Sequence, residues 1–241
     1  MEVVVSGLGA SRAWVRFAGR TWPLYESGGV WRTFLGTDPL TAPGRRGLTV
    51  EASGPSGTGV AVRAGLTVRR VAFPVRRITL APDRRNLLDP RLAEEEGRKV
   101  AAALRTLSAE RFWQGPFRIP VRGAVTSPYG VVSMYQGQIR GFHRGVDLAA
   151  PAGAPVYAAN DGIVRLAGSL PLSGNAVLLD HGMGIVTSYL HQSKVFVRAG
   201  QRVRRGEIIG RVGSTGLSTG PHLHWGFRIN GVHVDPMPWT R

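Results

Sequence analysis

The chain alternates short apolar and polar stretches that predict strands over most of its length. Residues 1–86 contain runs such as Ala13-Trp14-Val15-Arg16-Phe17 and Gly47-Leu48-Thr49-Val50-Glu51, separated by turns rich in Gly, Pro and Ser. A period of two residues places the apolar side chains on one face of a strand. The N-terminal region is therefore predicted to be a small β-sandwich or barrel.

One helix is predicted after this region. Asp89 is a potential N-cap, and Pro90 suits the first helical position. Apolar residues then recur at helical spacing, at Val100, Ala103, Leu104 and Leu107. We expect a helix over about residues 90–110, with the acids at 94–96 solvated near its start, where the helix dipole favours them. An aromatic and proline-bearing connector at 112–120 follows.

A second β-rich region begins near residue 121. Apolar runs punctuated by glycine predict strands at 156–158, 162–166, 176–179, 185–189, 207–212 and 223–229. The connections between them are too short for crossover helices, so we expect an antiparallel sheet. The predicted fold is mainly β, with an N-terminal β domain (1–88), a helix and connector (89–119) and a C-terminal antiparallel β-sheet domain (120–241).

Composition adds a strong positive charge. The 31 basic and 15 acidic side chains give a net charge of +16, and lysine occurs only at Lys99 and Lys194. Such a charge favours polyanions, which include nucleic acids, anionic lipids and anionic cell walls, but a solvated arginine-rich surface fits equally well. The arginines are scattered along the chain and form no DNA- or RNA-binding motif, so we predict no nucleic-acid partner.

Two sequence features bear on where the protein works. No window is apolar enough to span a bilayer, so no transmembrane segment is predicted. The opening residues Met1-Glu2-Val3 differ from the basic start and apolar core of a secretion signal. If the natural protein is exported, we expect its signal or anchor to be missing from this chain.

The second half of the chain holds the candidate chemistry. The sequence contains no cysteine, which excludes thiolate metal sites and thiol nucleophiles, and all six histidines lie beyond residue 120. Side chains separated by an even number of residues share one face of a strand. Three pairs have this spacing, namely His143 with Asp147, Tyr189 with His191, and His222 with His224. Mixed His and carboxylate ligands typify catalytic zinc. Spacing alone leaves open both a metal site and histidines that serve only packing.

Several separated motifs resemble one family in order and spacing. They are His143-Arg144-Gly145-Val146-Asp147-Leu148-Ala149-Ala150-Pro151, Pro155-Val156-Tyr157-Ala158, Asp161-Gly162, Asp180-His181-Gly182, Tyr189-Leu190-His191, and residues 213–225, which end in Pro221-His222-Leu223-His224-Trp225. Over about residues 120–239 the chain resembles the lysostaphin-type (LytM-type) zinc peptidases of bacterial cell walls. Agreement among several motifs is far more specific than any single motif.

The resemblance implies a function and a set of site residues. His143, Asp147 and His224 match the family's Zn²⁺ ligands, and His191 and His222 match its two non-ligating catalytic histidines. It implies a zinc metalloendopeptidase that hydrolyses peptide bonds in peptidoglycan stem peptides or cross-bridges, in the cell envelope. A non-catalytic peptidoglycan-binding scaffold or activator of other wall hydrolases is the alternative, because some relatives keep the fold and lose the metal.

A few positions depart from the family pattern or carry a different expectation. Gln192 stands where the family often has leucine, and Gly226 where many members carry an acid. Tyr135 lies near the position of a tyrosine that helps some relatives hold the reaction intermediate. Its register is loose, however, and a packing role explains it equally well. We interpret His181 and His233 as structural residues. The Gly/Ser/Thr run at 213–220 has no Lys-Ser/Thr for phosphate, so we expect a tight loop beside His222.

The role of the N-terminal region stays open at this point. It could target the wall, cover the site in a latent form or give structural support.

Overall fold

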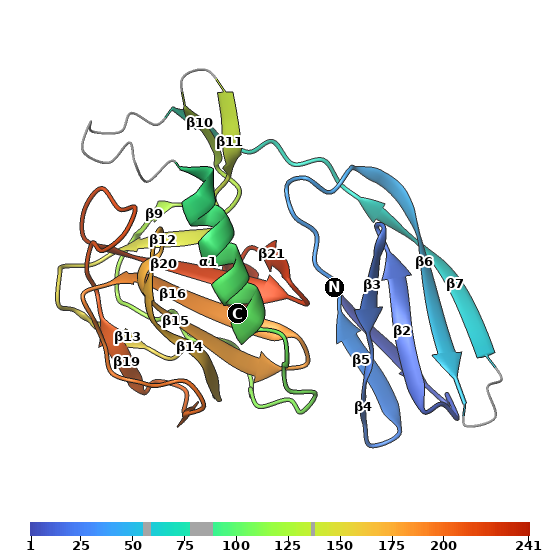
Figure 1. Ribbon diagram of the computed structural model, residues 1–241. Coiled ribbons are helices and arrows are strands. Elements are labelled where there is room, and N and C mark those ends of the chain that lie inside the picture. The colour runs from blue at the N-terminus through green and yellow to red at the C-terminus, as the bar shows by residue number, and fades with distance from the viewer. Residues whose placement is uncertain (55–58, 78–88, 136–137) are drawn as a thin grey trace. The chain divides into compact units, whose positions relative to one another are not determined.

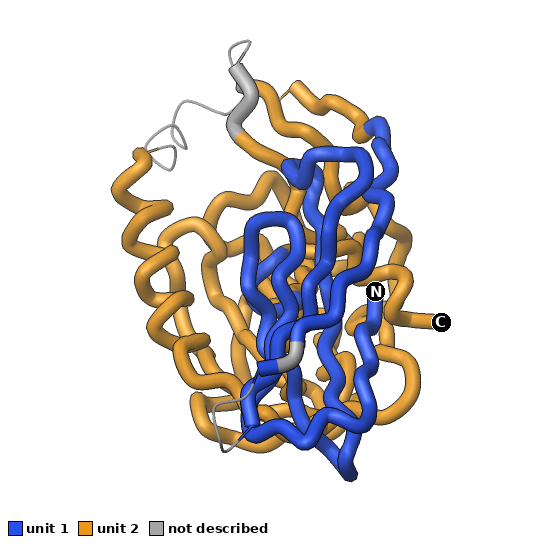
Figure 2. The backbone as a smooth tube through the Cα atoms, turned by 90° about the vertical axis from the view of Figure 1, so that its right-hand side faces the viewer, with its two compact units in different colours: residues 1–72, 229–232 blue, residues 73–228, 233–241 orange. Residues whose placement is uncertain are grey.

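The computed structural model describes residues 1–54, 59–77, 89–135 and 138–241, with the backbone alone at 60, 135 and 138–140. The chain forms two compact units (Figure 2), one of residues 1–72 and 229–232 and the other of residues 73–228 and 233–241. The predicted domain boundary at residue 88 lies outside the described residues. The N-terminal segment of the first unit ends at Ala72, because the next strand pairs within the second unit.

The first unit consists of antiparallel strands (Figure 1). They are β1 (Glu2–Ser6), β2 (Arg12–Phe17), β3 (Arg20–Pro23), β4 (Tyr25–Ser27), β5 (Val30–Phe34), β6 (Gly44–Ser53) and β7 (Gly59–Val68). Among the described residues they form two sheets, in the orders β1-β5-β4 and β3-β2-β6-β7. Val15 and Val50 are buried on the second sheet, and Trp31 and Thr33 on the first. The alternation seen in the sequence therefore produces one buried face per sheet.

The second unit is larger and contains the helix. Its strands are β8 (Val75–Arg77), β9 (Val125–Ser127), β10 (Val132–Tyr135), β11 (Gln138–Phe142), β12 (Gly145–Ala149), β13 (Pro155–Tyr157), β14 (Gly162–Leu170), β15 (Gly174–Gly182), β16 (Ile185–Gln192), β17 (Lys194–Val195), β18 (Arg202–Val203), β19 (Ile208–Arg211), β20 (His222–Ile229) and β21 (Val232–Val234). Its helices are α1 (Pro90–Ala103) and a 3-10 turn (Met237–Thr240). Within the described parts of the chain, no helix combines the length and apolarity needed to cross a bilayer.

An antiparallel sheet forms the centre of this unit. Its strand order is β18-β14-β15-β16-β20-β12-β9, with β21 paired to β20. Smaller sheets have the orders β13-β19-β17 and β11-β10-β8, and β8 and β10 run parallel to each other. The mainly β fold with one α-helix and antiparallel sheets is thus confirmed over the described residues. The large sheet brings β12, β16 and β20 side by side, which are the strands with the candidate residues.

Helix α1 begins where the sequence predicts and ends earlier. Asp89 caps it by accepting a hydrogen bond from the Arg91 amide, and Pro90 is the first helical residue. The predicted end near residue 110 is wrong, because the helix ends at Ala103. The following segment bonds to β15 instead: the Ser108 amide donates to the Asp180 carboxylate at 2.8 Å, and the Phe112 amide donates to the His181 carbonyl at 2.9 Å.

His181 lies in the core of the second unit, with no exposed surface. Its Nδ1 donates to the Asp161 carbonyl at 2.6 Å, and its Nε2 lies 2.7 Å from the Thr187 hydroxyl. The ring of Phe117 meets it edge-on, with centroids 5.0 Å apart. Burial lowers the pKa of His181 to about 4, so the side chain is neutral in the folded protein at neutral pH.

The low pKa of His181 predicts an acid-sensitive contribution to stability. The unfolded chain takes up a proton near pH 6.5 while the folded chain resists protonation, so the free energy of unfolding falls as pH drops below 6.5. Between pH 6.5 and 5 we expect a loss of about 2 kcal/mol from this residue. Urea unfolding at several pH values should show a shallower decline for His181→Gln than for the unsubstituted chain. Equal slopes would contradict this assignment.

Candidate metal centre and groove

Two paired strands position the candidate metal ligands. β12 and β20 are antiparallel, and their register places Asp147 directly opposite His224 and Ala149 opposite His222. Gly145 makes room for the His224 ring. A Cβ at Gly145 would lie 2.8 Å from His224 Nε2 and 2.4 Å from the Trp225 carbonyl oxygen, so any larger residue there would displace the ring or the strand.

His143 reaches the same point from the chain just before β12. Its amide donates to the Val131 carbonyl at 2.8 Å, and its carbonyl accepts from the Gly130 amide at 2.9 Å. Its Nδ1 donates to the Pro128 carbonyl at 2.8 Å. Because Nδ1 carries the proton, the lone pair of Nε2 faces Asp147 and His224.

The candidate ligand atoms of His143, Asp147 and His224 form a tight triangle. His143 Nε2 lies 2.9 Å from Asp147 Oδ1 and 2.9 Å from His224 Nδ1, and His224 Nδ1 lies 3.0 Å from Asp147 Oδ1. Ligands about 2.0–2.2 Å from a tetrahedral metal are separated by about 3.3 Å, close to what is seen. The two imidazoles and the carboxylate turn acceptor atoms toward one point. This arrangement fits a divalent cation, because a cation offsets the repulsion among the lone pairs of the three atoms.

His191 enters the site through an unusual backbone conformation. It has a φ of +63°, in the left-handed region that residues other than glycine rarely adopt. The prediction that Tyr189 and His191 share a face is wrong, because this φ reverses the alternation at the end of β16. Tyr189 is fully buried, and its hydroxyl accepts a hydrogen bond from the Ala159 amide at 2.8 Å. His191 instead lines a groove beside His143, Asp147 and His224, which we call the metal group.

His191 and His222 are both held by loop carbonyls. His191 Nδ1 donates to the Thr215 carbonyl at 2.8 Å, and His222 Nδ1 donates to the Gly220 carbonyl at 2.9 Å. In the neutral form of each ring this bond keeps the proton on Nδ1 and leaves Nε2 as an acceptor. The His222 Nε2 lies 3.7 Å from Asp147 Oδ1. The ring centroids of His191 and His222 are 4.9 Å apart. The 213–220 loop thus lies beside His222, where the sequence predicts it, and fixes the tautomers of both histidines.

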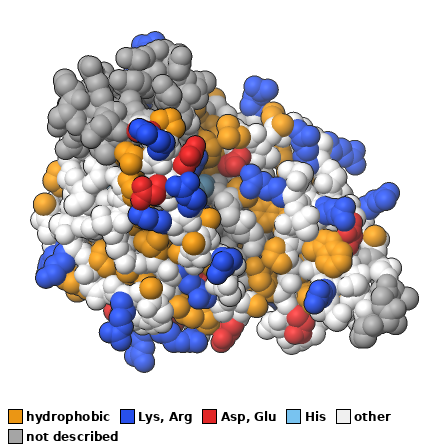
Figure 3. All heavy atoms as spheres, in the orientation of Figure 1, with side chains coloured by type: hydrophobic (Ala, Val, Ile, Leu, Met, Phe, Trp, Pro, Cys, Tyr) orange, Lys and Arg blue, Asp and Glu red, His pale blue; other side chains and the backbone are white. Residues whose placement is uncertain are grey.

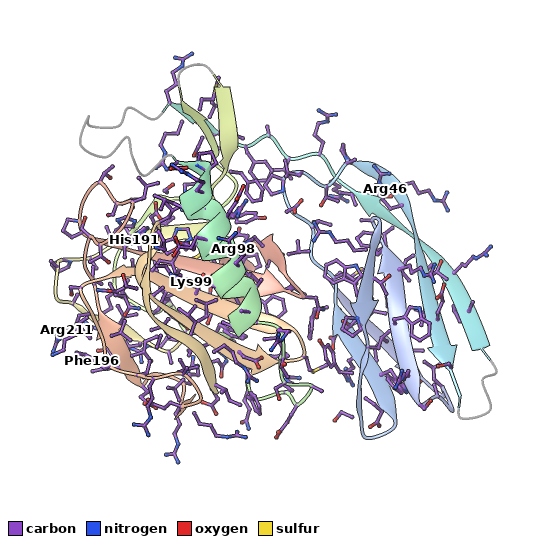
Figure 4. The ribbon with its side chains drawn as sticks, viewed as in Figure 1. Arg46, Arg98, Lys99, His191, Phe196 and Arg211 are labelled. Carbon is purple, nitrogen blue, oxygen red and sulfur yellow. The ribbon has the colours of Figure 1, made fainter. Side chains whose placement is uncertain are left out.

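The five predicted residues open onto one groove of about 610 Å³. Figure 4 marks His191 in the second unit, and Figure 3 shows a histidine side chain at the surface among basic and acidic ones. Helix α1 contributes Glu96 and Val100 to the groove wall, and the loop contributes Leu217, Ser218 and Thr219. A groove with a row of unprotonated imidazoles beside a metal group can hold an extended peptide and exchange protons with it.

Burial dominates the electrostatics of the site. It lowers the pKa of His191 to about 4 and also lowers the pKa of His224, so both imidazoles are neutral at neutral pH. Burial acts in the opposite direction on Asp147, but its contacts with His143 and His224 outweigh that effect and hold the pKa of the carboxyl well below its usual range. The Asp147 carboxylate is ionised and the His224 imidazole is neutral, as metal binding requires.

Sequence reasoning missed several groove residues. Glu96 is not a solvated residue of the first helical turn, because its carboxylate accepts from the amides of Leu172 and Ser173 at 2.8 and 3.0 Å. His233 lines the groove wall. Arg228 also lines it, and its even spacing from His222 and His224 along one strand was a usable signal. The side chain of Tyr135 lies outside the described residues.

Comparison with known proteins identifies the family. Residues 141–236 match the model of peptidase family M23. A crystal structure of a candidate M23 peptidase from Pseudomonas aeruginosa is 30% identical, with 99% of this chain and 92% of that chain covered and a TM-score of 0.69. The chain belongs to peptidase family M23. The match to the M23 model includes all five predicted residues and both strands of the His-Asp-His group.

Curated M23 relatives match over the same region. The peptidoglycan DD-endopeptidase ShyC of Vibrio cholerae is 45% identical over 100 residues, which are 42% of this chain and 23% of that protein. The DD-carboxypeptidase/endopeptidase Mpg of Neisseria meningitidis is 52% identical over 95 residues, which are 39% of this chain and 22% of that protein. The match therefore spans less than a quarter of either relative.

Proposed function

We propose that this M23 protein is a zinc-dependent endopeptidase that hydrolyses peptide bonds in peptidoglycan stem peptides or cross-bridges. The observation that carries the proposal is the convergence of His143, Asp147 and His224 within 4.8 Å, with His191 and His222 in the same groove. The names of the relatives ShyC and Mpg support a peptidoglycan substrate and action in the cell envelope. The net charge of +16 suits an anionic wall.

The donor set favours zinc among the divalent cations. Two imidazole nitrogens and one carboxylate oxygen are common ligands of catalytic zinc, and three protein ligands leave a position open. Zinc held by these residues would supply Lewis-acid activation of a water molecule and of the scissile carbonyl. Asp147 supplies the negative charge of the set, while the Pro128 carbonyl orients His143 through its Nδ1.

The two other histidines supply proton transfer. His191 and His222 are fixed through Nδ1 by loop carbonyls, with Nε2 turned away from them. One neutral imidazole can accept a proton from the attacking water, and a protonated imidazole can donate to the departing amine or stabilise the developing oxyanion. The presence of all three metal ligands and both histidines supports an enzyme rather than a non-catalytic scaffold.

Digestion of purified sacculi tests the proposal. We expect the protein with zinc to convert cross-linked muropeptides into uncross-linked ones, each cleavage adding one water and freeing one amine, as measured by mass spectrometry. Asp147→Asn is the matched control, because it keeps the side-chain shape and removes the charge of the metal group. Unchanged muropeptide composition after prolonged digestion with zinc-loaded protein would contradict the proposed activity.

A further inference from the structure

The groove beside the metal group is rich in arginine. Four arginines line it, Arg76, Arg77, Arg144 and Arg228, together with the carboxylates Glu96 and Asp147. Asp147 is part of the candidate metal centre, and both oxygens of Glu96 accept hydrogen bonds from Leu172 and Ser173. The four guanidinium groups outnumber the two carboxylates, so the groove lining keeps a net positive charge and an anionic ligand would find a favourable potential there.

Arg228 is the groove arginine on β20, the strand that carries His222 and His224. His222, His224 and Arg228 have even spacing on β20 and all three line the groove. Gly226 lies between His224 and Arg228, and a Cβ there would collide with the Ser188 hydroxyl oxygen. Arg228 and His143 line the same groove.

The guanidinium of Arg228 is only partly satisfied by the protein. Its Nε is buried and has no hydrogen-bond partner among the described residues. Burial lowers the pKa of Arg228 to about 10, with a further contribution from the charge of Arg144, and it therefore stays positively charged at neutral pH. A buried cation with a free donor is costly unless an anion pairs with it.

Arg144 and His233 complete the surroundings of Arg228. Arg144 is exposed and its guanidinium lies over the Phe142 ring, 5.9 Å from the centroid. Burial and then the charges of Arg228 and Arg144 lower the pKa of His233 to about 3, so His233 is neutral and its Nδ1 donates to the Arg144 carbonyl at 3.2 Å. Glu96 attracts Arg228 at longer range, while its oxygens stay bound to the turn between β14 and β15.

We propose that Arg228, assisted by Arg144, forms a subsite that binds a carboxylate of the substrate peptide next to the metal group. The planar guanidinium of arginine pairs with carboxylates through two parallel hydrogen bonds, which suits a role in specificity. The carboxylate belongs either to the C-terminus of the peptide or to one of its side chains. This inference rests on the proposed peptidase function and names the chemistry of its substrate.

Binding of a peptide that has no cross-link tests the subsite without requiring turnover. The probe is a synthetic stem tetrapeptide, L-Ala-γ-D-Glu-meso-diaminopimelyl-D-Ala, as the free acid, as the C-terminal amide and as the side-chain amides. Titration calorimetry with the zinc-loaded chain should show that one amide binds about tenfold or more weakly than the free acid, as expected for loss of a charge-assisted hydrogen bond. The amide that binds weakly identifies the source of the carboxylate.

Variants then assign the preference to Arg228. Arg228→Met should bind the acid and the amide with equal affinity, and Arg228→Lys should keep part of the preference for the acid. Arg144→Gln should reduce that preference less than Arg228→Met does. Arg98→Gln is the matched control, because Arg98 lies on α1 (Figure 4), is exposed and loses the same charge outside the groove lining. Circular dichroism checks that each variant is folded.

The outcomes separate the subsite from the peptidase proposal. A preference for the free acid that disappears in Arg228→Met supports the subsite even if sacculi are not digested. Equal affinity for acid and amides, or a preference unchanged in both Arg228→Met and Arg144→Gln, overturns the subsite even if sacculi are digested.

Discussion

His143→Ala is expected to lose both the bound metal and the hydrolysis of muropeptides. The remaining Asp147 and His224 would offer two ligand atoms, whereas catalytic zinc is held by three protein ligands. Inductively coupled plasma mass spectrometry should find about one zinc per chain in the unsubstituted protein and much less zinc in the variant. Cleavage of cross-linked muropeptides should fall to the detection limit, because metal and water activation are lost together.

Chelation provides the control for this substitution. Removing the metal from the unsubstituted chain should stop hydrolysis, and adding zinc back should restore it, whereas added zinc should not restore His143→Ala. Circular dichroism should show that both samples are folded, because His143 precedes β12 and lies outside the buried core. Full activity in a chelated, metal-free sample would exclude the metal-dependent mechanism.

His191→Ala and His222→Ala are expected to retain the metal and lose turnover. Neither imidazole belongs to the His-Asp-His group, and each is fixed by a carbonyl with Nε2 free for proton transfer. Loss of a general acid or base typically lowers the rate by about 10²–10⁴-fold. We therefore expect near-stoichiometric zinc in both variants and a fall of that order in kcat for cross-link hydrolysis.

A third histidine provides a matched comparison. His181→Gln removes an imidazole that is buried in the core away from the groove, so activity at pH 7.5 should be close to that of the unsubstituted chain. If His191→Ala and His222→Ala lost zinc in proportion to activity, they would act through the metal and not through proton transfer. If both kept full activity, neither histidine would take part in the reaction.

Periodicity and motif order predicted the strands that carry the site. The runs at 162–166, 176–179 and 185–189 correspond to the longer strands β14, β15 and β16, because Gly-bounded apolar stretches mark where a buried strand must begin and end. The even spacing of His222 and His224 was sufficient to place both on the groove side of β20. These predictions depend on local geometry, which a sequence contains directly.

The errors arose where contacts distant in sequence override local preference. The alternation of side chains along a strand predicts that Tyr189 and His191 share a face. A φ of +63° at His191 reverses that alternation, and nothing in the neighbouring residues signals it. The helix stops at Ala103 because the next residues bond to β15, more than 70 positions away. Glu96 suits a solvated helix by composition, yet it binds the turn at Leu172 and Ser173. Such pairings become visible only once the sheet is assembled.

The use of main-chain carbonyls at Thr215 and Gly220 to hold the two histidines has an evolutionary consequence. A carbonyl is present whatever side chain the residue carries, so substitutions in the loop leave the orientation of His191 and His222 intact as long as its path is kept. Leu217 and Thr219 face the groove from the same loop, whereas the buried Ser218 holds the loop by donating its hydroxyl to the Gly220 carbonyl at 2.8 Å. This arrangement lets substrate preference diverge among descendants of one enzyme while the reaction itself is inherited unchanged.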